Sequence, residues 1–178
     1  AAFSLTPSQA MQGVIDYTTM NGKATWDAMT SRLQPKTEAL FDCKADNLLE
    51  FLVKVGERAS EHDWAEPGSI LSIPNATGVQ RNMVEFYGAV TRPEAVAHVT
   101  TWVNTPTRNA QDDKALHKCL LQSLSMQGKN KLANVRDNTM AHGVPSGVML
   151  LKTIIEESHL DSSATVLSIR RKLTTLHQ

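Results

Sequence analysis

Glu156 and His159, near the C-terminal end, are the residues whose types and spacing come closest to a metal site. They form one Glu-x-x-His pair, and this spacing places both side chains on the same face of a helix. A di-iron helical bundle needs two such pairs and two further glutamates, and the sequence contains no second pair. A solvated helix end accounts for the pair more simply, so we expect no metal and no other cofactor.

His117 and Cys119 are the candidates for nucleophilic catalysis. Residues i and i+2 of a helix face apart, so these two side chains do not form a nucleophile and its base locally. Cys119 shares an apolar stripe with Leu116 and Leu120, which predicts a small core residue. The motifs G-x-S-x-G and G-x-G-x-x-G are absent, and the Gly-Lys pair at Gly128 lacks the Ser or Thr of a phosphate-binding loop. The sequence therefore predicts a protein that is not an enzyme.

Arg170, Arg171 and Lys172 form the one basic triplet of the sequence. One interpretation is a phosphate or RNA contact, although three cations supply only a weak, salt-dependent attraction. The other interpretation is a solvated helix face, with favourable positive charge near a helix C-terminus. Both interpretations stay open at this stage.

Charge and composition limit the classes of function. The 178 residues carry 18 Lys and Arg and 18 Asp and Glu, a balance that argues against a dedicated nucleic-acid binder. Residues 1–90 hold 7 basic and 11 acidic residues, net −4, and the remainder is net +4, which suits head-to-tail association. No apolar run is long enough to span a bilayer, and no secretory signal is visible. Two cysteines supply neither a disulfide framework nor a four-ligand zinc site, so we expect a reducing, intracellular compartment.

Helical periodicity runs through nearly the whole chain. The clearest stripe consists of Ala45, Leu48, Leu52, Val55 and Ala59, which fall on one face of an amphipathic helix. No useful strand alternation is present, and the three tryptophans read as core anchors rather than ligand platforms. We therefore predict an all-α fold of about eight helices, at 6–20, 24–33, 45–59 and 79–90, from 93 onward, around 116–124, around 148–155 and around 166–176. A hinge is expected at 138–145, where Gly143 and Pro145 occur.

The last third of the chain carries a longer pattern. From residue 147 it reads G-x-x-L-L-K-x-I-I-x-x-x-H-x-D-x-x-A-T-V-x-x-I-R-x-K-L-x-x-L. This pattern resembles the Gag polyprotein of copia-type LTR retrotransposons. Two upstream segments show a weaker likeness. One begins with Leu40-Phe41-Asp42, continues through residues 47–52 and ends at Trp64, and the other contains Val103-Asn104, Arg108 and Gln111. The resemblance covers roughly residues 37–178 and leaves residues 1–36 outside it.

The resemblance implies a fold and a division into domains. Capsid subunits of this family are two small helical domains joined by a hinge. We therefore expect a helical extension at 1–36, a capsid N-terminal-type domain at 37–140, and the opening helices of a C-terminal-type domain at 141–178. Related sequences continue past the position of Gln178 with further helices, so the second domain is expected to be cut short here. Leu151 stands where the family usually carries an aromatic residue.

The resemblance also implies a function. Members of the family assemble into virus-like particles in the cytoplasm that enclose the RNA of the element. We thus expect this chain to be a structural protein whose partner is itself, with RNA held through regions outside the chain and no membrane partner. The candidate assembly residues are Met11, Val14 and Ile15 in the first helix, and Val148, Leu151 and Ile155 after the hinge. The alternative for each is a place in the chain's own core.

A second function stays open beside the capsid. Two cysteines cannot form the zinc knuckle with which many Gag proteins bind RNA. Its absence favours a Gag descendant that a host has adopted as a helical protein–protein interaction module. An enzyme with unrecognised metal or acid–base chemistry is the third and weakest hypothesis.

Overall fold

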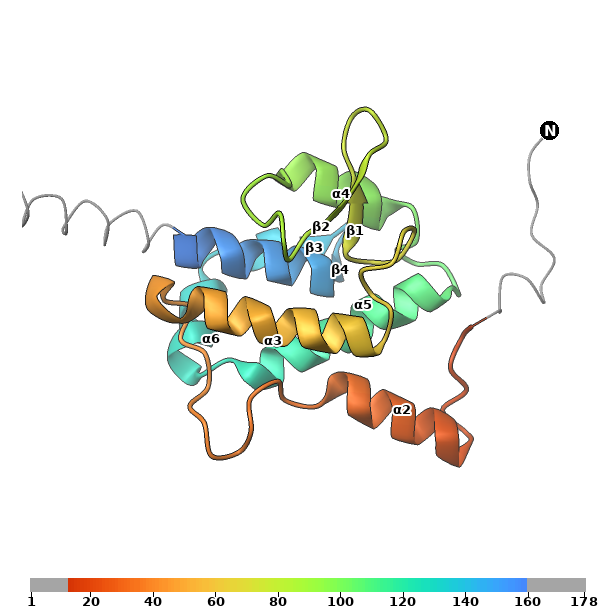
Figure 1. Cartoon of the computed structure of the whole chain (residues 1–178), viewed down its shortest axis with the longest axis horizontal. Coiled ribbons are helices and arrows are strands. Elements are labelled where there is room, and N and C mark those ends of the chain that lie inside the picture. Colours follow the sequence, from red (N-terminus) through yellow and green to blue (C-terminus); the bar gives the residue numbers. More distant parts are fainter. Residues whose placement is uncertain (1–12, 160–178) are drawn as a thin grey trace, which may run out of the picture.

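Helices make up most of the computed structural model, which describes residues 13–159 of the chain (Figure 1). The α-helices are α2 (Met20–Thr30), α3 (Leu48–Glu61), α4 (Arg92–Thr100), α5 (Arg108–Ser123), α6 (Met126–Ala133) and a helix over residues 147–159. Two 3-10 helices, η1 (Ala45–Asn47) and η2 (Arg136–Thr139), precede α3 and follow α6. In Figure 1, α2 and α4 lie at opposite edges of the view, with α3 and the helix 147–159 between them. The prediction of a mainly helical chain is confirmed.

Two small antiparallel strand pairs interrupt the helices. Strand β1 (Ser72–Pro74) pairs with β2 (Gln80–Asn82), with Ile73 opposite Arg81. Strand β3 (Met140–Ala141) pairs with β4 (Val144–Pro145), with Ala141 opposite Val144. The predicted helix at 79–90 is therefore wrong at its start, where β2 lies, and turns follow it up to residue 89. The reason is local, because the Asn75 side chain accepts hydrogen bonds from the Thr77 and Val79 amides and so closes a hairpin turn.

The first described helix begins where the sequence predicted an end. Residues 13–19 form turns and irregular backbone, and Asn21 and Gly22 lie in the first turn of α2 rather than after a helix. Thr19 caps α2 by accepting a hydrogen bond from the Gly22 amide. Glycine is required here by close approach, because a Cβ on Gly22 would lie 1.8 Å from the Asp16 carbonyl oxygen. The predicted helix at 6–20 is thus wrong over 13–19, and its residues 6–12 lie outside the described part.

The predicted stripe on α3 is largely confirmed. Its members Leu48, Leu52, Val55 and Ala59 are buried, together with Phe51. They enter a hydrophobic core that also takes in Trp64 and Trp102, so two of the three expected aromatic anchors are buried. Trp26 packs against this core while staying partly exposed.

The expected hinge at 138–145 is a turn of η2 followed by the β3–β4 hairpin. The hairpin reverses at His142 and Gly143, both of which have positive φ. Beyond it, the helix 147–159 buries its apolar side chains in the same core as α3 and α5. Within the described residues, a boundary at 140/141 therefore does not separate two cores. Any division that involves residues beyond 159 lies outside the described part.

The helix count also differs from the prediction of about eight. The described residues contain six α-helices. The predicted helix at 166–176 lies outside them, and 79–90 is not helical. The structure also contains a helix that the sequence did not predict, since α6 is separate from α5 and contains Gly128.

Candidate functional site

The helix 147–159 holds half of the predicted assembly residues, and it holds them inside the protein. Val148 and Leu151 are 0% exposed and Ile155 is 2% exposed. Residues 148–151 are all buried in succession, so this helix is covered on every side over its first turns. These three residues belong to the core, and their assignment to an assembly surface is wrong.

The other predicted assembly residues lie near or beyond the first described residue. Val14 and Ile15 are half-buried, and Ile15 packs against the core. The Gln111 side chain binds both backbone groups of Ile15. Its Oε1 accepts from the Ile15 amide at 2.7 Å, and its Nε2 donates to the Ile15 carbonyl at 2.8 Å. Met11 and the basic triplet Arg170, Arg171 and Lys172 lie outside the described residues.

The outer face of α3 exposes apolar side chains that the sequence reasoning missed. This face consists of Leu49, Val53, Glu57 and Ser60, which lie opposite the buried stripe. Leu49 is 63% exposed and Val53 is 60% exposed. The signal was present in the sequence, because the doublets Leu48-Leu49 and Leu52-Val53 place apolar residues on both sides of one helix.

Carboxylates lie along one flank of this outer face. A cavity beside α3 is lined by Val53, Gly56, Glu57, Ala59, Ser60, Asp63, Ala65, Glu66, Asn82, Val84 and Glu85. Four of these residues are acidic and none is Lys or Arg. The two cations of α3 that lie nearby are paired with other carboxylates, Lys54 with Glu38 and Arg58 with Glu61. The outer face of α3 is thus apolar at its centre and negative along its flank.

A second surface has the opposite character, and we call it the basic groove. It is a cavity of about 240 Å³ lined by His117, Leu121, Lys129, Leu132, Ala133, Arg136, Thr139, Met140, Pro145 and Leu150. Lys129 and Arg136 are exposed. Burial lowers the pKa of His117, so Lys129 and Arg136 carry the charge of this groove at neutral pH. Its remaining lining is mostly aliphatic.

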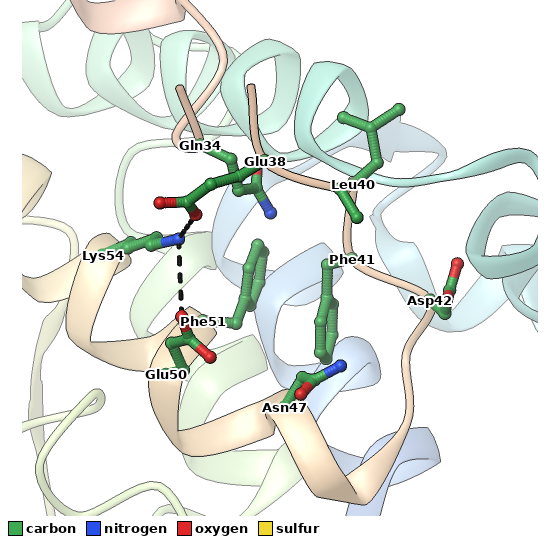
Figure 2. A pocket seen from close by; sticks show the side chains of 10 residues that line it. Gln34, Glu38, Leu40, Phe41, Asp42, Asn47, Glu50, Phe51 and Lys54 are labelled. Carbon is green, nitrogen blue, oxygen red and sulfur yellow. Dashed lines mark hydrogen bonds and ion pairs between the residues drawn. The ribbon is translucent and has the colours of Figure 1, made fainter. Parts of the chain in front are cut away.

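A third cavity, of about 270 Å³, lies where the segment before η1 meets α3 (Figure 2). Phe41 and Phe51 stack in its wall with ring centroids 4.2 Å apart. As Figure 2 shows, Lys54 reaches toward two carboxylates, Glu38 and Glu50. These charges neutralise one another and tie the loop to the helix, so we interpret this cavity as a structural junction.

Two buried carboxylates lie side by side in α5. Burial raises the pKa of Asp113 to about 6, against hydrogen bonds from the Val148 amide and the Ser146 hydroxyl that lower it. Burial also raises the pKa of Asp112, against its 2.8 Å ion pair with Arg108. The indole N–H group of Trp64 lowers the pKa of Asp112, and that of Trp102 lowers the pKa of Asp113. Neither indole N–H has the geometry of a hydrogen bond. Asp113 is thus engaged across two helices, and Asp112 is engaged in an ion pair within α5.

The expected place of Cys119 in the core is confirmed. It is fully buried, and burial raises the pKa of its thiol to about 11. Because the thiolate is the reactive form, this environment suppresses nucleophilic chemistry at neutral pH. Arg58 Nη1 lies 3.4 Å from Sγ and also donates to the carbonyls of Met29 and Ser31.

Glu156 and His159 lie in different environments. Glu156 forms an ion pair with Arg92 of α4 at 2.6 Å, while His159 is exposed. Over residues 13–159, no three His, Cys, Asp or Glu side chains come together as metal ligands would. The same part of the chain has no helix of the length and apolar character that crossing a membrane requires.

Comparison of the chain with protein-family models, with curated proteins and with solved structures gives no match. The likeness to copia-type Gag therefore depends on the residue pattern alone. The described geometry adds two surfaces of opposite character to that pattern, the outer face of α3 and the basic groove.

Proposed function

We propose that the chain is a structural subunit of the Gag capsid type, which assembles with copies of itself into cytoplasmic virus-like particles that enclose retroelement RNA. The residue pattern over 147–176 supports the family. The main support for self-association is the outer face of α3, because Leu49 and Val53 expose apolar area that a neighbouring copy would cover. The RNA is held through regions outside this chain, and Arg170, Arg171 and Lys172 remain the candidate contact within it.

Opposite charges on one chain support the same proposal. The net −4 of residues 1–90 and the net +4 of the remainder reduce the self-repulsion that a crowded lattice imposes. Contacts within such a lattice are individually weak, and their multiplicity supplies the stability of the particle. Small apolar contacts of the size that Leu49 and Val53 offer are consistent with this kind of assembly.

The test is self-association of the full chain, measured by sedimentation velocity over a range of concentrations and by negative-stain microscopy. We expect oligomers or particles at high concentration. The double variant Leu49→Ser/Val53→Ser should weaken association at least tenfold, since each aliphatic side chain contributes on the order of 1 kcal/mol or more when a partner covers it. Met20→Ser is the matched control, because Met20 is an exposed apolar residue on α2 and its loss should change association little.

A monomer at every concentration and salt level would contradict self-assembly of this chain. In that case the exposed pair on α3 fits the second candidate, a host-adopted interaction module that binds a different protein. The coding sequence on either side separates the two functions. Protease, integrase and reverse transcriptase in the same reading frame support the capsid, and their absence around an intact frame supports the module.

A further inference from the structure

We infer that the outer face of α3 of one copy docks into the basic groove of the next copy, so that copies join head to tail. This inference rests on the proposed self-assembly and names the two surfaces that meet in it. The two surfaces are built from different elements, α3 on one side and α5, α6, η2 and the β3–β4 hairpin on the other.

The basic groove has room for the apolar side chains of the α3 face. The basic groove is lined by the buried side chains of Leu132 and Leu150 and by Leu121, which is exposed. A cavity of about 150 Å³ is large enough to take up benzene. The groove, at about 240 Å³, therefore has room for an aliphatic side chain from a neighbour. Leu49 and Val53, one helical turn apart, supply two such side chains on a rigid helix.

The charges of the two surfaces are complementary. Glu57 lies beside the apolar pair of α3, and Glu66 and Glu85 line the same cavity. Lys129 and Arg136 border the groove. Docking therefore brings opposite charges together at the edge of an apolar contact, which fixes the orientation of the partners. Two α3 faces brought together would instead place like charges opposite each other, and the same holds for two grooves.

A contact between two different surfaces has a consequence for assembly. It leaves one free α3 face and one free groove on every pair of copies, except where a half turn between the two copies closes them through two reciprocal contacts. Repetition produces a ring or an extended array, depending on the rotation between neighbours. A contact of this type can repeat through a particle shell.

The experiment exchanges the charges of the two surfaces in the full chain. One variant carries Glu57→Lys, and the other carries Lys129→Glu/Arg136→Glu. Each variant alone places like charges across the contact, so we expect the dissociation constant from sedimentation velocity to rise at least tenfold. An equimolar mixture of the two variants restores association, because a contact between two different variants joins opposite charges. The three substitutions combined in a single chain restore association too.

Control variants are available on α2. Lys23→Glu and Asp27→Lys reverse exposed charges outside both surfaces and should leave association unchanged. Circular dichroism and urea unfolding of every variant establish that it is folded. Unchanged association of the Glu57→Lys variant, or failure of the mixture to associate, overturns this inference.

The outcomes separate this inference from the proposed function. If the unaltered chain assembles and both charge variants assemble equally well, the named contact is wrong and the capsid proposal stands. If Glu57→Lys weakens association and only an added change on α3 itself repairs it, two α3 faces meet instead. If the unaltered chain stays monomeric, both the contact and self-assembly of this chain are wrong.

Discussion

Asp113 is a carboxylate with almost no access to water, and it joins two helices. Its Oδ1 accepts from the Val148 amide at 2.9 Å and from the Ser146 hydroxyl at 3.1 Å, at the start of the helix 147–159. An ionised carboxylate suits this position, since amides at a helix N-terminus carry partial positive charge. Burial opposes ionisation more strongly, and the pKa of Asp113 is raised to about 6 as a result.

The raised pKa predicts a pH dependence of folding stability. The pKa in the folded chain lies above the ordinary value of 3.8, so the folded state binds the proton more tightly. The stability of the unaltered chain relative to Asp113→Asn should therefore increase by about 2 kcal/mol as pH falls from 7.5 to 4.5. Urea unfolding of both proteins across this range measures the difference.

The contributions of other titrating groups to stability cancel when the unaltered chain is compared with Asp113→Asn. Burial lowers the pKa of His98 and His117, which makes the chain less stable as pH falls through their unfolded pKa near 6.5. This effect is shared by both proteins, so only their difference reports Asp113. A difference that stays constant between pH 7.5 and 4.5 would show that Asp113 keeps an ordinary pKa.

At the level of elements, the helix 147–159 begins very close to α5. A Cβ on Gly147 would lie 2.5 Å from the Asp113 carbonyl oxygen, 2.6 Å from the His117 nitrogen and 2.7 Å from the Leu116 Cβ. Two of these atoms belong to the backbone, so they cannot rotate out of the way. Glycine at this position sets the distance between the two helices, and it does so without a positive φ.

The close approach predicts the cost of adding one methyl group. Gly147→Ala should destabilise the chain by about 1–3 kcal/mol, because the helix must shift away from α5. Gly88→Ala is the matched control, since a Cβ at Gly88 meets nothing within 4 Å and its stability change should stay within about 0.5 kcal/mol. Thermal or urea unfolding measures both. Equal stability of the two variants would contradict the close packing at Gly147.

Element α3 shows how one helix serves two surfaces. Its buried stripe enters the core, while Leu49 and Val53 face outward with Glu57. The exposed pair lies outside the buried core, so it contributes less to the stability of the described fold than the stripe does. This separation is the reason that substitutions at Leu49 and Val53 can change association without unfolding the chain.

At the level of the whole molecule, one core extends from α2 to the helix 147–159. Met29 of α2, Val55 of α3, Leu120 of α5 and Leu151 belong to the same cluster of buried residues. Arg92 adds a polar link across the fold, since it bonds the Asn138 carbonyl, the Thr153 hydroxyl and the Glu156 carboxylate. The segment after the β3–β4 hairpin is therefore fastened to the rest of the described structure.

A shared core predicts a single cooperative unfolding transition. Tryptophan fluorescence and far-ultraviolet circular dichroism should give the same urea midpoint, because Trp64 and Trp102 lie in the core that also holds the helices. Hydrogen exchange should place the amides of 150–155 in the same slow class as those of α3 and α5. Early exchange of 150–155, with α3 and α5 still protected, would instead support a separate domain after residue 140.

Much of the fold could be predicted from the sequence. The stripe of α3 and the start of α4 depend on local signals, and Thr91 and Glu94 do form a capping box there beside Pro93. The hairpin at β1–β2 was missed because its strands are only three residues long, too short for alternation to appear. The Asn75 turn and Gly78, with its positive φ, were the usable signals.

The candidate site was less predictable, and the reason is geometric. An apolar stripe shows that one face of a helix is covered. It does not show whether the residues that cover it belong to the same chain or to another copy. Val148, Leu151 and Ile155 have the same apolar character as Leu49 and Val53, yet the first three are buried and the last two are exposed. The basic groove combines residues from 117 to 150, so no local pattern marks it.

The amino-acid sequence by itself determined the helical character of this protein, the positions of most helices and the absence of recognisable catalytic motifs. These properties depend on residue spacing within one or two turns, which a reader of the sequence can measure. Only the tertiary structure decided which apolar residues face solvent, that the helix 147–159 shares the core of α3, and that an acidic and a basic surface exist on one molecule. Such properties depend on contacts between residues far apart in the chain, because packing, unlike periodicity, is set by all the elements together.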